Sequence, residues 1–122
     1  MSALFDFHRT WGYVAIVLNA LAGIYALLAW KYRKLRSVWV VRSAIVAEAA
    51  LIIQVAAGTI LISSEQYTAP RFHLFYGYVA FITIGGVYTY RKAIRRKREL
   101  WLGLIGLFLM GVGVRAVLQV MQ

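Results

Sequence analysis

The stretch FHRTWGYVA, Phe7–Ala15, returns later in the chain as FHLFYGYVA, Phe72–Ala80. These two copies contain the only histidines of the sequence, His8 and His73, and each histidine precedes an apolar run. A repeated stretch of this kind predicts a repeated structural unit with one histidine in each copy.

Further identities at the same offset extend the repeat beyond this stretch. Gln54, for example, matches Gln119. We therefore predict an internal duplication of a helical hairpin, with repeat 1 at 7–62 and repeat 2 at 72–122. Two hairpins of the same topology are related by an axis along the membrane normal. Such an axis would place the two histidines at one depth, facing a shared object.

The composition is that of a membrane protein. The chain has 122 residues, of which 62% are hydrophobic, against about 45–50% in soluble domains. It has no cysteine, which excludes disulfides, iron–sulfur clusters and cysteine catalysis. The N-terminus has no basic segment, so we expect no cleaved signal peptide.

Four apolar segments are long enough to cross a bilayer, which takes about 20 residues. They cover residues 8–30, 38–62, 72–90 and 100–121. We therefore predict an all-α integral membrane four-helix bundle, built as two tandem hairpins and forming one domain over 1–122. Its principal partner is the lipid bilayer.

The basic residues predict the orientation of the bundle. The net charge is +10, and eleven of the fourteen basic residues lie in two clusters, 31–42 and 91–98, between apolar runs. This is the distribution of cytoplasmic loops in membrane proteins, so we do not expect nucleic-acid binding. The loops 31–37 and 91–99 are predicted to be cytoplasmic and both termini outside, in a multi-pass protein of a bacterial plasma membrane.

The histidines are candidate ligands for haem iron. Residues four apart share a helix face, so Gly12 lies below His8 and Gly77 below His73. A small residue beside an imidazole leaves space for a flat macrocycle, and imidazole is a common axial ligand of haem. Alternatively, the histidines are hydrated or capping residues and the glycines serve close helix packing.

Other groups near the histidines could assist a cofactor. Arg9 and Arg71 are expected close to the same interface, and guanidinium groups bind carboxylates such as haem propionates. A protein metal site is a further alternative, but two imidazoles do not complete a zinc shell unless Asp6 or Glu65 contributes.

The sequence HRTWG, from His8 to Gly12, resembles the His-Arg-x-x-Gly helix starts of small membrane b-type cytochromes, as in the cytochrome b561 and haem A synthase groups. The resemblance implies a four-helix bundle in which His8 ligates haem b, and the repeat carries the same role to His73. The second copy, HLFYG, lacks the arginine.

Four polar residues interrupt the apolar spans: Asn19, Glu48, Gln54 and Arg115. Ionisable groups within a membrane are functional candidates, so these residues are predicted to form a cluster for a quinone head group or a proton path. Alternatively, they fix the register of the helices, with Glu48 either protonated or paired with Arg115. The glycines of GLIGLFLMGVGVR, residues 103–115, are expected to serve helix packing.

The leading functional hypothesis is a haem b-binding electron-transfer protein, or a cytochrome-like subunit of a respiratory complex. One alternative is a haem-free accessory or assembly subunit of a larger respiratory or photosynthetic membrane complex. Another is a small transporter or channel-like homo-oligomer in which Glu48 and Arg115 line the transport path. Independent catalysis is not expected, because the sequence has no Ser/His/Asp constellation, paired carboxylates or phosphate-binding loop.

Overall fold

The computed structural model describes residues 2–65 and 67–121. In that part of the chain all regular secondary structure is helical. Each of the four long helices is long and apolar enough to cross a membrane, as the sequence predicts. Two short 3₁₀ turns lie in the connections. The elements are α1 (Ser2–Lys31), η1 (Arg33–Leu35), α2 (Val38–Ser63), α3 (Arg71–Thr89), η2 (Arg95–Lys97) and α4 (Arg98–Met121).

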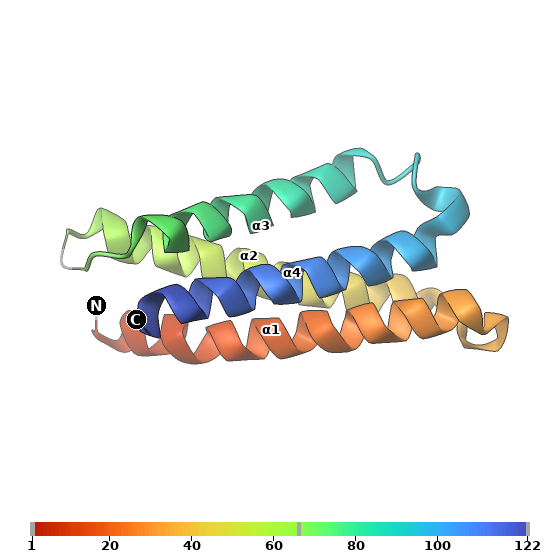
Figure 1. Ribbon diagram of the computed structural model, residues 1–122, viewed down its shortest axis with the longest axis horizontal. Coiled ribbons are helices and arrows are strands. Elements are labelled where there is room, and N and C mark those ends of the chain that lie inside the picture. Colours follow the sequence, from red (N-terminus) through yellow and green to blue (C-terminus); the bar gives the residue numbers. More distant parts are fainter. Residues whose placement is uncertain (1, 66, 122) are drawn as a thin grey trace.

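The four helices run antiparallel to their neighbours in the chain and form an elongated bundle (Figure 1). The start of α1, the end of α4 and the loop between α2 and α3 lie together at one end, which we call the histidine end (Figure 1). The two basic loops lie at the other, the basic end. Arg98 and Glu99, which were predicted to lie in the second basic loop, instead form the first turn of α4.

Glycines bring α1 and α4 into close backbone contact. A Cβ atom added to Gly106 would lie 2.8 Å from the Cα of Gly23, and one added to Gly23 would lie 3.0 Å from the carbonyl oxygen of Gly103. Small residues permit this approach between membrane helices. The expected packing role of the glycines in 103–115 therefore holds at Gly103, Gly106 and Gly113, whereas Gly111 faces open space.

Alanines and two polar side chains join α1 to α2. Asn19 is almost fully buried, and its Nδ2 donates to the carbonyl oxygens of Ala15 and, at 3.1 Å, of Ala47 on α2. The indole Nε1 of Trp11 donates to the carbonyl of Ala50 at 2.7 Å. Hydrogen bonds between helices stabilise membrane bundles in addition to packing.

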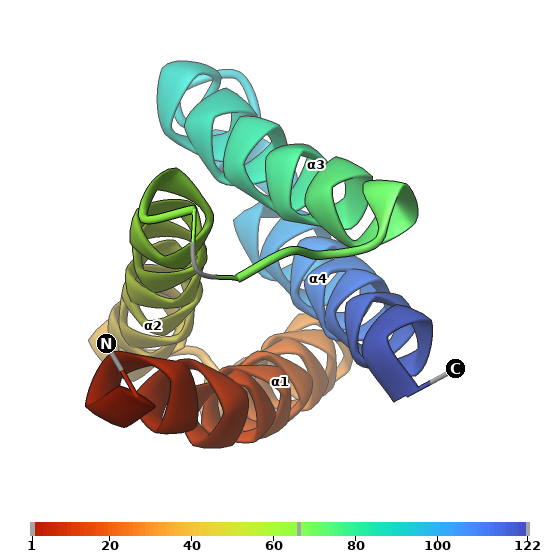
Figure 2. The same cartoon turned by 90° about the vertical axis from the view of Figure 1, so that its left-hand side faces the viewer.

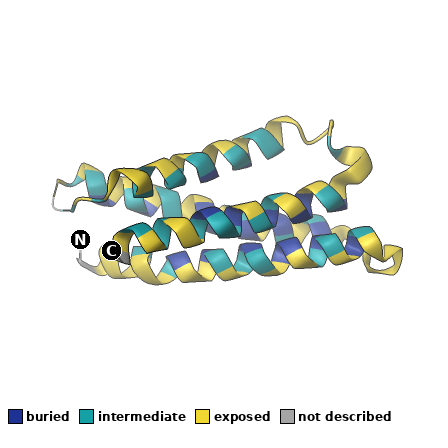
Figure 3. Cartoon of the chain, viewed as in Figure 1, coloured by how far each residue is buried: buried dark blue, intermediate teal, exposed yellow. Residues whose placement is uncertain are grey.

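The third helix is packed least. It lies mainly against α4 and touches α2 only lightly, whereas α1 packs closely on both α2 and α4. Figure 2, a view from the histidine end, shows α3 standing above the other three helices. Of the residues of α3, only Ala80 and Ile84 are buried, and Figure 3 shows that most of this helix is exposed or half-buried. The bundle therefore departs from the exact twofold symmetry that a perfect duplication would produce.

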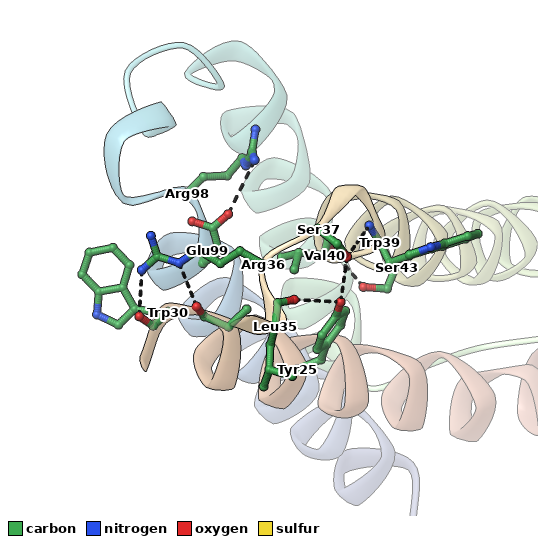
Figure 4. A network of polar contacts seen from close by, with 11 residues as sticks. Tyr25, Trp30, Leu35, Arg36, Ser37, Trp39, Val40, Ser43, Arg98 and Glu99 are labelled. Carbon is green, nitrogen blue, oxygen red and sulfur yellow. Dashed lines mark hydrogen bonds and ion pairs between the residues drawn. The ribbon is translucent and has the colours of Figure 1, made fainter. Parts of the chain in front are cut away.

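At the basic end, local contacts determine where α1 ends and α2 begins (Figure 4). The guanidinium of Arg36 donates to the carbonyl oxygens of Ala29 and Trp30, both at 2.8 Å, and lies 5.1 Å from the indole ring centre of Trp30. Carbonyls in the last turn of a helix lack intrahelical donors, so this cation both satisfies them and complements the helix dipole. The Oγ of Ser37 accepts from the N–H of Trp39 and caps the start of α2.

Candidate functional site: a histidine pair at one end of the bundle

The structure brings the two histidines together although they are far apart in sequence. His8 lies in the second turn of α1, and His73 lies in the first turn of α3, which begins after Pro70. The centres of the two imidazole rings are 6.2 Å apart, and the ring planes are nearly perpendicular, at 83°. The residues that the repeat relates to one another thus face each other across the bundle.

The imidazole of His73 is oriented by the main chain of α4. Its Nδ1 lies 2.9 Å from the carbonyl oxygen of Ala116. A carbonyl oxygen can only accept, so Nδ1 is the donor, and in the neutral imidazole Nε2 then keeps its lone pair. This arrangement, with one ring nitrogen donating to a carbonyl and the other left as a base, is typical of histidines that ligate metals.

The imidazole of His8 is held differently. Its ring packs on Gly58 of α2, where an added Cβ atom would lie only 2.9 Å from Cε1 of the histidine. Its Nδ1 is buried and has no hydrogen-bond partner among the described residues. The glycine is therefore needed to make room for the ring, and a polar atom of the ring is left unsatisfied.

Gln54 belongs to this site rather than to a mid-membrane cluster. Its Nε2 donates to the main-chain carbonyl of His8 at 2.6 Å, while its Oε1 is buried and unpaired among the described residues. The amide also fills the space beside Gly12, where an added Cβ atom would lie 2.8 Å from Nε2. The sequence predicts open space beside both Gly12 and Gly77. Of these two glycines only Gly77 has it, because no atom lies within 4 Å of a Cβ atom added there.

Both histidines line a cavity of about 320 Å³. It lies within the histidine end, and its walls come from all four helices and the loop between α2 and α3. Most of the lining is apolar, with few polar groups, which is the usual character of a site for a small molecule or cofactor. Besides the histidines, the lining includes polar or aromatic side chains: Phe5, Gln54, Thr59, Ser63, Tyr67, Thr68, Tyr76 and Tyr78.

The two arginines expected to assist a cofactor lie outside the cavity lining. Arg9 is 3.5 Å from the carboxylate of Asp6, and both side chains are two-thirds exposed. Arg71 is exposed at the start of α3. The possible extra ligands Asp6 and Glu65 do not join the histidines, and no group of three metal-ligating side chains occurs within residues 2–65 and 67–121.

The predicted polar cluster does not form in the structure. Asn19 connects α1 to α2, Glu48 is half-buried, and Arg115 is exposed. No ion pair joins Glu48 to Arg115 in the described part of the chain. Asn19 does lie at about the depth of Glu48, as expected. Its side chain donates to the carbonyl of Ala47, which immediately precedes Glu48 in α2.

Sequence reasoning did not identify Gly58 as part of the site. The signal that could have indicated it is its spacing: Gly58 follows Gln54 by four residues, so both lie on one face of α2. The carbonyl of Ala116 carries no signal in the sequence, because every residue has a main-chain carbonyl.

Comparison with protein-family models, with curated proteins and with solved structures gives no match to this chain.

Proposed function

We propose that this chain is a membrane-embedded electron-transfer protein that holds one haem b between His8 and His73. The observation that carries the proposal is the opposed pair of imidazoles inside an apolar cavity. When bound, haem supplies reversible one-electron oxidation and reduction. The role of the chain is to hold the group, to exclude water from it and to place it near one membrane surface.

His8 and His73 would hold the iron of the haem, and their rings lie close enough for one ion to bind to both. The observed distance between ring centres is 6.2 Å.

Several features of the site support a macrocycle rather than simple packing. The Nε2 of His73 is free to bind a metal, because Nδ1 already donates to Ala116. Open space lies beside Gly77, and the buried Nδ1 of His8 has no described partner to fix its present orientation. The cavity is at the small end of the range of roughly 300–1,000 Å³ for ligand sites. The loosely packed α3 is the element that would give way to enlarge it.

The membrane setting of the proposal follows from the charge distribution. The basic loops 31–37 and 91–99 would face the cytoplasm of a bacterial cell, and both termini and the histidine end would lie outside. The duplication of 7–62 as 72–122 explains why one histidine comes from each hairpin. Haem near the outer surface would suit a subunit that exchanges electrons with a respiratory complex or with quinone.

The experiment is an absorption spectrum of the purified protein in detergent, after expression with added haem precursor. We expect a Soret band with sharp α and β bands on reduction, and a haem b product in the pyridine haemochrome assay. His8→Ala and His73→Ala should each lose the reduced bands. Phe72→Ala, which changes an exposed residue beside His73, is the control and should keep them.

A second candidate is a haem-free accessory or assembly subunit of a larger membrane complex. It is favoured by the outer face of α3, where Phe75, Tyr78, Phe81 and Ile82 are each more than half exposed. Such a protein would be colourless after haem supplementation and would co-purify with a membrane partner. A colourless preparation whose histidine variants keep that partner would refute the haem proposal.

A further inference from the structure

An open hollow at the basic end is lined by two tryptophans and two cationic side chains. Its lining consists of Trp30 at the end of α1, Ala93, Arg96 and Lys97 in the connection before α4, and Trp101 in the first turn of α4. Arg96 and Lys97 are exposed, and neither makes an ion pair in the described part of the chain. The hollow thus combines unpaired positive charge with two indole rings.

The charge around this hollow lacks compensation. Residues 91–98 include six basic residues. The one acid nearby, Glu99, is buried and lies 3.5 Å from Arg98. Arg91 donates to the carbonyl of Tyr88 near the end of α3, whereas Arg95, Arg96 and Lys97 immediately precede the N-terminus of α4, where the helix dipole favours negative charge. An anion placed here would be stabilised both by the side chains and by the helix end.

The first basic loop differs in this respect. It follows the C-terminus of α1, where the helix dipole favours positive charge, and Arg36 binds the terminal carbonyls directly. Arg36 is therefore complemented by the fold, whereas Arg96 and Lys97, which lie just before the N-terminus of α4, have no acidic partner in the described part of the chain. This contrast between Arg36 and the pair Arg96 and Lys97 indicates where an anion would bind.

We propose that the hollow binds the phosphate head group of an anionic phospholipid. A lipid fits better than free phosphate because an apolar stripe continues from the hollow along α4. Trp101, Leu104 and Phe108 are 45%, 48% and 50% exposed and share one face of the helix. Tryptophan side chains prefer the depth of lipid head groups, with acyl chains below them. Basic groups at this depth bind anionic head groups.

The test compares two double variants with the same change in net charge. Arg96→Gln/Lys97→Gln neutralises the hollow, and Arg33→Gln/Lys34→Gln neutralises two exposed cations of η1 that do not line it. Delipidated protein in neutral detergent is titrated with phosphatidylglycerol, and bound lipid is counted by native mass spectrometry. We expect the first variant to weaken the tightest binding about 30-fold and the second by less than about threefold.

Two further arms identify the ligand. Phosphatidylcholine should bind weakly to the wild type, and inorganic phosphate should not displace phosphatidylglycerol at equal concentration. Circular dichroism shows that both variants keep their helices. Equal weakening in the two double variants would overturn the proposal, because it would mean diffuse attraction to the whole basic end. Displacement by phosphate alone would refute the lipid as ligand. Neither outcome depends on haem.

Discussion

The contact between α1 and α4 leads to a sharp prediction for Gly106→Ala. The new Cβ atom would lie 2.8 Å from the Cα of Gly23, and 3.0 Å from the carbonyl oxygen of Asn19. Carbon atoms in contact are about 3.5–4.0 Å apart, so the two helices would have to separate by several tenths of an ångström. Because the obstructing atoms are main-chain atoms of a helix, no side chain can rotate to relieve the overlap.

The magnitude follows from two opposing effects. Overpacking of a well-packed contact costs about 1–3 kcal/mol. Replacement of glycine by alanine within a helix gains up to about 1 kcal/mol from helix propensity. We therefore expect Gly106→Ala to lower the free energy of unfolding by about 1–2 kcal/mol. The assay is unfolding in mixed micelles with increasing sodium dodecyl sulfate, followed by far-ultraviolet circular dichroism.

Gly111→Ala is the matched control on the same helix. An added Cβ atom at Gly111 meets no atom within 4 Å, so this variant should have only the gain in helix propensity. It should be as stable as the wild type or more so. If Gly106→Ala and Gly111→Ala unfold at the same detergent composition, the close approach of α1 and α4 is refuted.

Three other predictions use the same unfolding assay or hydrogen exchange. Asn19→Ala removes the bond to Ala47 and should lower the free energy of unfolding by about 1 kcal/mol; unchanged stability would contradict a role in joining α1 to α2. Trp11→Phe keeps an aromatic ring but removes the donor to Ala50, so a loss of about 0.5–1.5 kcal/mol is expected. Arg36→Met removes the charged donor at the end of α1, and amide exchange in that last turn should become about tenfold faster. Exchange at the wild-type rate would show that the guanidinium does not hold the helix end.

The four helices were predictable because each is apolar over the thickness of a bilayer and each is bounded by charged or turn-forming residues. The boundary of the first span was less accurate: it was placed at His8, but α1 begins at Ser2. Asp6 and Arg9 lie three residues apart and pair on the surface of α1, inside the helix. Charges near a helix end do not stop a helix.

The candidate site was predictable only in part. The repeat of FHRTWGYVA as FHLFYGYVA placed one histidine on each hairpin, and the structure brings the two rings within 6.2 Å. The cluster of Gln54 with Glu48 and Arg115 was inferred from depth alone. Depth does not give the rotation of a helix about its own axis, and that rotation directs Gln54 to the main chain of His8 and leaves Arg115 exposed.

The sequence by itself determined the class of this protein, because hydropathy, span length and the position of basic residues act locally and need no partner. It also shows that each histidine stands within one copy of a similar stretch, FHRTWGYVA and FHLFYGYVA. Only the tertiary structure decided the unequal packing, in which α1 lies against α4 through glycines and α3 stands apart. The same packing decided the hydrogen bond of His73 to the carbonyl of Ala116 and the packing of the His8 ring on Gly58. It also decided the cavity that both histidines line. These features depend on how whole helix faces fit together, and apolar helices in lipid carry little periodic signal of which face meets which.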